Sequence, residues 1–187
     1  MEHSEKDIDT LYKDNVDALY LYARNLGYDK QLAIDAIHDV FCKIFASNRQ
    51  LRDISNIKSY LFKALRNRLL DMSKSHHEFV DIDTVTANDM HFALEVTIED
   101  KLINAEEQAK IEKRINRMLS ILTDRERELV YLRFMQGCEY EEIAENLQIT
   151  LPACYNFMSK VMNKLRKQDP AAFALFMIFM NQNINKG

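Results

Sequence analysis

The sequence predicts an all-α protein with two small helical domains joined by an acidic linker, the second containing a helix-turn-helix. Glycine and proline, which mark turns between strands, number only 3 and 2 in 187 residues. Apolar residues recur at the three- and four-residue spacing of amphipathic helices, and strand-like alternation is hard to find. The length suits one large domain or two small ones.

Three helices are predicted in the first domain, residues 1–75. The first covers residues 11–26 and stops at a glycine, and the second covers residues 31–46. The apolar stripe of the second helix comprises Ala33, Ile37, Val40, Phe41, Ile44 and Phe45. The polar stretch 48–55 is expected to be a loop, and the third helix covers residues 56–73.

The acidic linker spans residues 76–104, where the helical period is lost. Residues 76–122 hold 10 acidic against 5 basic residues, so the acidic charge of the chain is concentrated here. The adjacent His76 and His77 raise the question of a metal, but neighbouring residues do not share a helix face and no further ligand pattern follows. We therefore expect a solvated segment that is helical at its end, and no metal site.

The second domain, residues 105–168, opens with an amphipathic helix over residues 105–122. Residues 123–126 have the spacing of a capping box, which predicts that the next helix begins there, and Gly137 predicts its end. After a second short helix, Thr150 is positioned to cap a third. A short helix, a tight turn and a capped helix form the arrangement that places side chains in the DNA major groove.

The period of this last helix predicts which side chains face the core. A 4-3-4 spacing selects Cys154, Met158, Val161 and Leu165 as buried. The outer face then comprises Tyr155, Asn156, Ser159, Lys160 and Asn163. Asn can pair with adenine edges, and Ser and Lys can contact bases or phosphates. An ordinary helical hairpin with a solvated polar face is the alternative.

The C-terminal extension, residues 169–187, contains ten consecutive residues without a polar side chain, 171–180. This run is too short to span a bilayer, so we expect no stable membrane insertion. We expect a helix that packs on the second domain. The alternative is an exposed segment that docks a partner protein or regulates this protein.

The charge distribution argues against tight DNA binding by this chain alone. The net charge is −4, and residues 123–187 hold 8 basic against 8 acidic residues. The one local basic stretch, residues 54–75, has five Lys or Arg against a single Asp. A protein that neutralises so few phosphates is expected to bind DNA together with a partner.

Composition also limits the compartment and the chemistry. The 3 cysteines are odd in number and far apart, which suits buried thiols in a reducing cytoplasm. The first ten residues are polar and acidic, unlike a signal peptide. The sequence has no nucleophile–base set and no glycine-rich phosphate loop, so we expect neither enzyme activity nor a cofactor.

Four motifs, in this order, resemble those of bacterial RNA polymerase sigma factors of the extracytoplasmic function (ECF) subfamily. They are AIDAIHDVFCKIF (33–45), YLFKALRNRLLDMSK (60–74), EYEEIAE (139–145) and ACYNFMSKVMNKLR (153–166). The last is especially similar to the FecI-like branch. The resemblance implies a sigma factor that binds core RNA polymerase and directs promoter-specific initiation in a stress, envelope or nutrient response. Residues 1–75 would be region 2 and residues 105–168 region 4.

The resemblance also implies which residues act. The second helix would bind core polymerase through Asp35, His38, Asp39 and Lys43. The third helix and the loop before it would melt the −10 element and hold an extruded base, which requires cations and a planar group. The residues of this group are Arg49, Arg52, Asn56, Ser59, Tyr60, Lys63, Arg66 and Asn67. The −35 duplex would be read by Tyr155, Asn156, Ser159, Lys160 and Asn163, with Lys164 near phosphates.

The implied partners are core RNA polymerase, promoter DNA that is duplex at −35 and melted at −10, and an anti-sigma factor as a candidate. One alternative is a stand-alone helix-turn-helix regulator that dimerises through the first domain and binds DNA tightly without polymerase. Another is a helical adaptor with no role in nucleic-acid binding.

Several positions depart from the pattern of the family. Gln148 stands where the turn usually has glycine, and a left-handed conformation there would cost about 1–2 kcal/mol. Arg68 replaces an apolar residue, so its stem must pack while its head finds a partner or water. Tyr155 and Phe157 stand where many members have Lys and Arg, which weakens phosphate contact at the −35 element.

Overall fold

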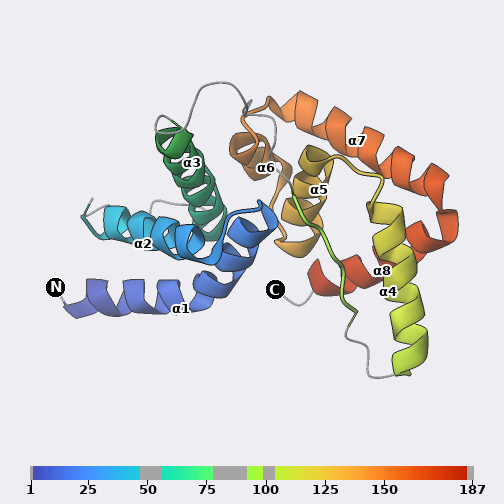
Figure 1. Ribbon diagram of the computed structural model, residues 1–187, viewed down its shortest axis with the longest axis horizontal. Helices are drawn as coiled ribbons and strands as arrows, with labels where there is room; N and C mark the ends of the chain where they lie inside the picture. The colour runs from blue at the N-terminus through green and yellow to red at the C-terminus, as the bar shows by residue number, and fades with distance from the viewer. Residues whose placement is uncertain (1, 47–55, 78–91, 99–103, 185–187) are drawn as a thin grey trace. The chain divides into compact units, whose positions relative to one another are not determined.

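The computed structural model describes residues 2–46, 56–77, 92–98 and 104–184, and every regular element in these ranges is helical (Figure 1). The elements are α1 (Glu2–Asn25), α2 (Lys30–Ala46), α3 (Ile57–His77), α4 (Ala105–Leu119), α5 (Asp124–Val130), the π-helical turn η2 (Tyr131–Met135), α6 (Tyr140–Asn146), α7 (Leu151–Gln168) and α8 (Pro170–Ile184). The predicted all-α class is confirmed. The chain divides into two compact units, Met1–His91 and Phe92–Gly187.

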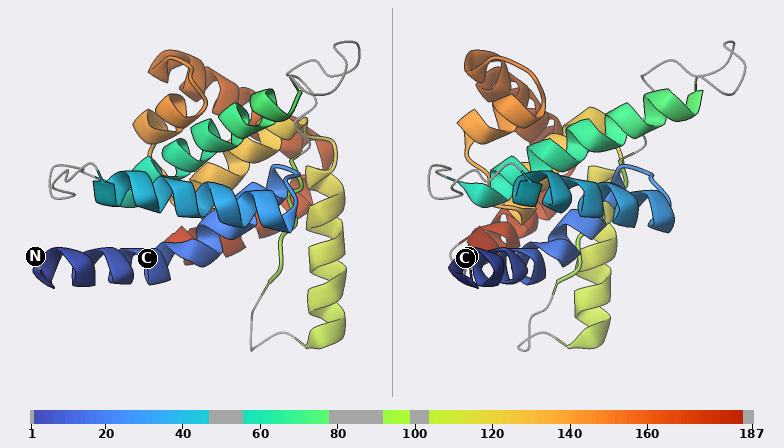
Figure 2. Two further views of the ribbon diagram at one scale, coloured as in Figure 1. Left: turned by 60° about the vertical axis from the view of Figure 1, so that its left-hand side comes forward. Right: turned by 90° about the vertical axis from the view of Figure 1, so that its left-hand side faces the viewer.

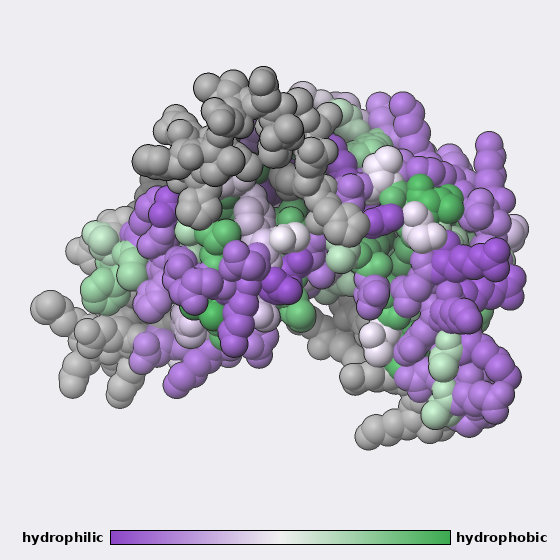
Figure 3. Space-filling model, in the orientation of Figure 1, coloured by the Kyte–Doolittle hydropathy of each residue, from purple (hydrophilic) through white to green (hydrophobic). Residues whose placement is uncertain are grey.

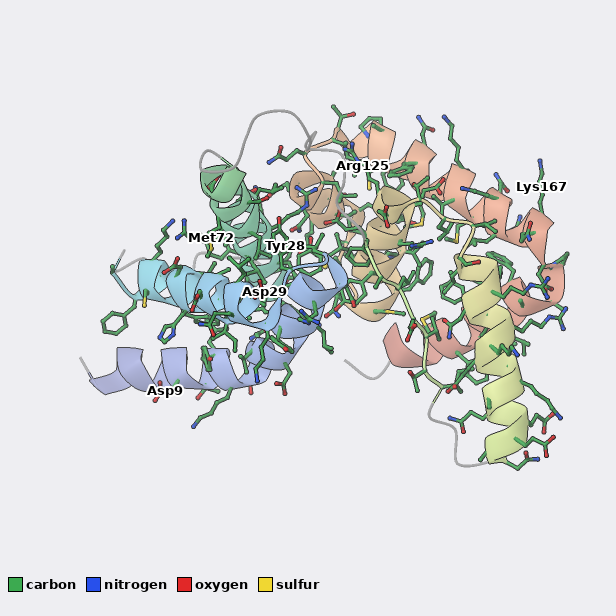
Figure 4. All side chains as sticks on the ribbon, in the orientation of Figure 1. Asp9, Tyr28, Asp29, Met72, Arg125 and Lys167 are labelled. Atoms are coloured by element: carbon green, nitrogen blue, oxygen red, sulfur yellow. The ribbon has the colours of Figure 1, made fainter. Side chains whose placement is uncertain are left out.

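The first unit is a bundle of α1, α2 and α3, each packed against the other two (Figure 2). Tyr28 and Asp29 lie in the short connection between α1 and α2 (Figure 4). Asp29 begins α2 by accepting a hydrogen bond from the Leu32 backbone N–H at 2.9 Å, as an N-cap residue does. In the core, the ring of Tyr22 meets that of Phe62 edge-on, with 5.0 Å between centroids. These two rings and the leucines Leu19, Leu61, Leu65 and Leu69 are completely buried, and burial of such large apolar side chains stabilises the bundle.

The apolar stripe predicted for α2 is correct with one exception. Five of the six residues are buried, but Phe45 is 57% exposed. The prediction for Phe45 was wrong because it lies next to the C-terminal end of α2, where the helical period alone does not show whether another element covers the side chain. The expected loop 48–55 lies outside the described residues.

The second unit begins with an extended segment, residues 92–98, and not with a helix. Its side chains alternate strictly between the core and solvent, and Phe92, Leu94, Val96 and Ile98 are buried. The backbone N–H groups of Phe92, Val96 and Ile98 donate to side chains of α4 and α5 at 2.7–2.8 Å. Side chains thus do for this segment what a neighbouring strand does in a sheet. The expectation of a linker without a period, helical at its end, is wrong for these residues.

Two caps predicted from the sequence begin α5 and α7. The Thr123 backbone N–H donates to Glu126 at 2.8 Å in a capping box, and Thr150 accepts from the Ala153 N–H at 3.4 Å. The four residues expected to anchor α7 in the core, Cys154, Met158, Val161 and Leu165, are all buried. Burial raises the pKa of the Cys154 thiol, with a smaller contribution from Glu141, which fits a structural thiol.

The C-terminal apolar segment forms α8, which packs on α4, η2 and α7. Ala172, Phe173, Phe176 and Met180 are buried, and the Phe176 ring meets Phe134 edge-on at 5.5 Å. Asp169 joins the helices: it accepts two hydrogen bonds from Arg114 of α4, at 2.7 and 2.8 Å, and one from the Ala172 N–H at 3.0 Å. The expectation of a helix packed on the second domain is therefore confirmed. The described helices include none that is both long and apolar enough to cross a bilayer.

Two departures from the family pattern have visible consequences. Gln148, in the turn between α6 and α7, has φ 55°, the left-handed conformation that favours glycine. Arg68 directs its head to Asp39 of α2, with Nε 2.8 Å from Oδ2. The charged head of Arg68, which was expected to need a partner or water, is thus paired with Asp39.

Candidate polymerase and nucleic-acid interfaces

The predicted polymerase-binding residues lie along α2, and three of the four are exposed. Asp35, His38 and Lys43 are accessible, and Asp35 accepts a hydrogen bond from Gln31 at 3.0 Å. Asp39 differs, because it is half-buried and its carboxylate is held by Arg68. Asp39 therefore ties α2 to α3 and presents less free charge than its neighbours.

Exposed apolar side chains accompany these charges on α2. Ile34 is 39% exposed and Phe45 is 57% exposed, both at helix positions next to the predicted polymerase contacts. Sequence reasoning missed this feature because it assigned Phe45 to the core. A surface that mixes charges with large apolar side chains is typical of a protein–protein interface.

Seven of the eight predicted −10 residues divide into three groups, and Ser59 is separate from them. Tyr60, Lys63, Arg66 and Asn67 are all half-buried on α3. Asn56 caps the helix: its side chain accepts from the Ser59 N–H at 3.1 Å. Arg49 and Arg52 lie outside the described residues.

Ser59 does not belong to the DNA-facing group. Its residue is only 7% exposed, because it lies on the side of α3 that turns toward the bundle core with Phe62. The three- and four-residue spacing correctly places Ser59 on the same side of the helix as Asn56 and Lys63. It does not show which residues on that side are covered by the neighbouring helices. The predicted role of Ser59 in DNA contact is withdrawn.

The predicted −35 face of α7 is exposed as the period required. Tyr155, Asn156, Ser159, Lys160 and Asn163 are all solvent-accessible. In the view of Figure 3 the outer part of this unit, around α7 and α4, is mainly hydrophilic. Lys167, labelled in Figure 4, lies at the C-terminal end of the same helix.

Lys164 is the exception on α7. Its Nζ lies 2.7 Å from Oε2 of Glu126 on α5, and both side chains are partly buried. Burial pushes the pKa of Glu126 up, but the hydrogen bonds from Lys164 and Thr123 outweigh it and lower the pKa below its usual value. Lys164 therefore joins α7 to α5 and is not positioned as a phosphate contact, contrary to its predicted role.

An aromatic stack at the start of α7 was not foreseen. The Tyr155 ring lies on the Tyr140 ring of α6, with 4.5 Å between centroids and 38° between planes. On Tyr140 lies the guanidinium of Arg133, with its carbon 4.9 Å from the ring centroid. We name these three residues the Tyr155 stack. Tyr155 follows Tyr140 by 15 positions, and Tyr140 follows Arg133 by 7, with a turn in each interval. No local sequence pattern pairs residues at such separations, so only the tertiary structure could reveal the stack.

The helix before the recognition helix carries acidic charge. Of the seven residues of α6, Glu141, Glu142 and Glu145 are acidic and none is basic. On α7, Lys160, Arg166 and Lys167 are exposed cations. The near balance of charge keeps phosphate attraction weak and leaves the exposed polar and aromatic groups of α7 to decide what is bound.

Comparison with known proteins finds a matching family model for each of the two units. The family model described as Sigma-70 region 2 matches residues 11–78, and the model described as Sigma-70, region 4 matches residues 112–165. The chain is 24% identical over 152 residues to the ECF RNA polymerase sigma factor SigM of Bacillus subtilis (strain 168), over 76% of this chain and 83% of that protein.

A solved structure is also similar. It is the co-crystal structure of the sigma factor RpoE in complex with the anti-sigma factor NepR from Bartonella quintana. The TM-score is 0.56 at 23% sequence identity, and the match covers 87% of this chain and 96% of the other. At that identity the likeness shows a shared fold.

Proposed function

We propose that this chain functions as a sigma factor of the extracytoplasmic function (ECF) subfamily, within the sigma-70 family. It binds core RNA polymerase and directs promoter-specific transcription initiation, a role that is not enzymatic. The observation that carries this conclusion is the presence of regions 2 and 4 in order in one chain, matched over residues 11–78 and 112–165.

We infer that α2 contacts the polymerase through Asp35, His38 and Lys43. Their exposure and mixed charge support this role, since charge complementarity sets the register and the rate of association. The exposed Ile34 and Phe45 add the apolar area that charges alone lack. Asp39 takes part indirectly, by holding α2 against α3 through Arg68.

We infer that α3 binds the melted −10 strand through Tyr60, Lys63, Arg66 and Asn67. Tyr60 supplies a flat face for an unstacked base, and the two cations suit the backbone. All four side chains are at least partly accessible on one helix. Arg49 and Arg52, which precede α3 in the chain, remain part of the proposal.

We infer that α7 reads the −35 duplex through Tyr155, Asn156, Ser159, Lys160 and Asn163. Their exposure supports this role, and the near-neutral charge of the unit explains why the polymerase must supply most of the affinity. The helix thus aims the enzyme and does not hold DNA by itself.

The finer assignments are also proposals. The motif of residues 153–166 supports the FecI-like branch and a stress, envelope or nutrient response. The scattered cysteines, none of which forms a disulfide, support a cytoplasmic protein; Cys138 and Cys154 are buried as expected, whereas Cys42 is exposed, contrary to the expectation of buried thiols. The solved complex whose title names an anti-sigma factor supports a partner of that kind for this chain.

In vitro transcription with purified core RNA polymerase tests the function. Adding the chain should produce transcripts from a promoter mapped after its overexpression, and the Tyr60→Ala variant should reduce them about tenfold or more, since a stacked base contributes roughly 1–3 kcal/mol. Lys113→Ala, on an exposed part of α4, is the matched control and should retain full activity. Folded protein that supports no initiation would exclude the function, and tight DNA binding without polymerase would favour a stand-alone regulator.

A further inference from the structure

The Tyr155 stack holds one aromatic ring in a defined place on the recognition helix. Tyr155 is the fifth residue of α7, in the N-terminal part that enters the major groove in helix-turn-helix proteins. One face of its ring is covered by Tyr140, yet the residue is still 48% exposed. A large apolar surface is thus presented to solvent in the region where base edges are read.

The base of the stack is fixed to the backbone. Arg133 donates from Nη1 to the Cys138 carbonyl at 2.9 Å and to the Glu139 carboxylate at 3.1 Å. Its guanidinium then lies against the Tyr140 ring. Since the Nη1 atom of Arg133 is held by two acceptors, its guanidinium has a fixed position beside the Tyr140 ring, and Tyr155 in turn stacks on Tyr140.

The chemistry of the exposed ring selects its ligand. A cation at this position would attract a phosphate or pair with guanine, whereas a tyrosine ring offers an apolar face. The apolar group that the major groove displays is the C5-methyl of thymine. The acidic residues of α6, Glu141 and Glu145, further disfavour a position deep against phosphates.

From this geometry we propose that Tyr155 determines specificity at the −35 element by contacting a thymine methyl group, and that Tyr140 is the residue that positions it. The inference rests on the proposed −35 role of α7 and goes beyond it by naming the group that is read. Recognition of this kind depends on one methyl group per base pair and only weakly on salt, because no charge is neutralised.

Deoxyuridine substitution tests the methyl contact directly. The holoenzyme, assembled from core polymerase and the full chain, is offered duplex promoters in which each −35 thymine is replaced in turn by deoxyuridine, which removes only the methyl group. Competition binding should fall about threefold to tenfold at one or two positions. Tyr155→Ala should bind thymine and uracil promoters equally, and Tyr155→Phe should keep the preference.

The positioning role has its own variants. Tyr140→Ala should reduce the thymine preference, and Tyr140→Phe, which keeps a ring under Tyr155, should restore it. Thermal unfolding of each variant shows whether the unit remains folded. Tyr140→Ala with an unchanged thymine preference would overturn the positioning role.

The outcomes separate this inference from the function on which it rests. Normal initiation by the wild-type factor with no sensitivity to any deoxyuridine would overturn the methyl contact and leave the sigma function intact. Absence of initiation on every template would overturn the function and, with it, the inference.

Discussion

Replacing Gln148 with glycine should stabilise the second unit, because this residue occupies the left-handed region with φ 55°. A side chain in that conformation costs about 1–2 kcal/mol. The greater freedom of glycine in the unfolded chain offsets about 0.5–1 kcal/mol of the gain. The two local backbone hydrogen bonds, from Gln148 to Glu145 and from Ile149 to Ala144, do not involve the side chain and remain. The net gain is about 0.5–1 kcal/mol.

Gly137 provides the matched control with the opposite sign. It has φ 71°, and an added Cβ would meet no heavy atom within 4 Å, so Gly137→Ala changes backbone strain and little else. The strain of about 1–2 kcal/mol is offset by about 0.5–1 kcal/mol, because alanine has less freedom than glycine in the unfolded chain, so this variant should lose about 0.5–1 kcal/mol. A strain of the same origin is thus removed at one position and introduced at the other.

Scanning calorimetry of the full chain measures both effects. Since the two units can unfold separately, the transition that Gly137→Ala lowers identifies the second unit. Gln148→Gly should raise that same transition by about 2–8 °C. If Gly137→Ala behaves as expected while Gln148→Gly lowers the transition, the glutamine side chain contributes more than its backbone costs, and the reasoning about strain is refuted.

Three further predictions concern charges. Lys160→Gln should weaken promoter binding by the holoenzyme and reduce the slope of the logarithm of the binding constant against the logarithm of the salt concentration by about 1. Lys164→Gln should leave that slope unchanged and should instead lower the melting temperature of the second unit. Arg114 lowers the pKa of Asp169 from its ordinary 3.8 to about 2. The pair therefore stabilises the fold fully above about pH 4 and loses this effect as the pH falls towards 2. Urea unfolding across that pH range should show the loss of stability in the wild type and not in Asp169→Asn. Arg68→Leu, which removes the ion pair between α2 and α3, should cost about 1 kcal/mol by urea unfolding of the first unit; an unchanged midpoint would show that the pair contributes nothing.

Some of the candidate site could be predicted because helical periodicity is local. The exposed face of α7 and its buried anchors, Cys154 and Leu165 among them, followed from spacing alone, as did the caps at Thr123 and Thr150. Each of these features depends on residues within one or two turns of each other, so their positions along the chain already determine their geometry. The order of the motifs then indicated the family.

The errors all concern contacts between residues far apart in sequence. Lys164 was predicted to contact DNA phosphates, but its ammonium group binds Glu126, which lies 38 residues earlier in the chain. Ser59 and Phe45 were placed on the wrong side of a burial boundary, because the boundary is set by neighbouring helices. No local pattern specifies such partners, since they form only when separate elements pack.

The sequence by itself determined the helical class, the capped starts of α5 and α7 and most of the core faces of the helices, because local hydrogen bonding and hydrophobic period encode these features; the start of α1, expected at residue 11, lies at Glu2. Only the tertiary structure decided that residues 92–98 belong to the second unit, since side chains of α4 and α5 satisfy their backbone. It likewise decided that Tyr155 is held by Tyr140 and Arg133. The physical reason is that packing joins elements whose separation along the chain carries no information about their distance in space.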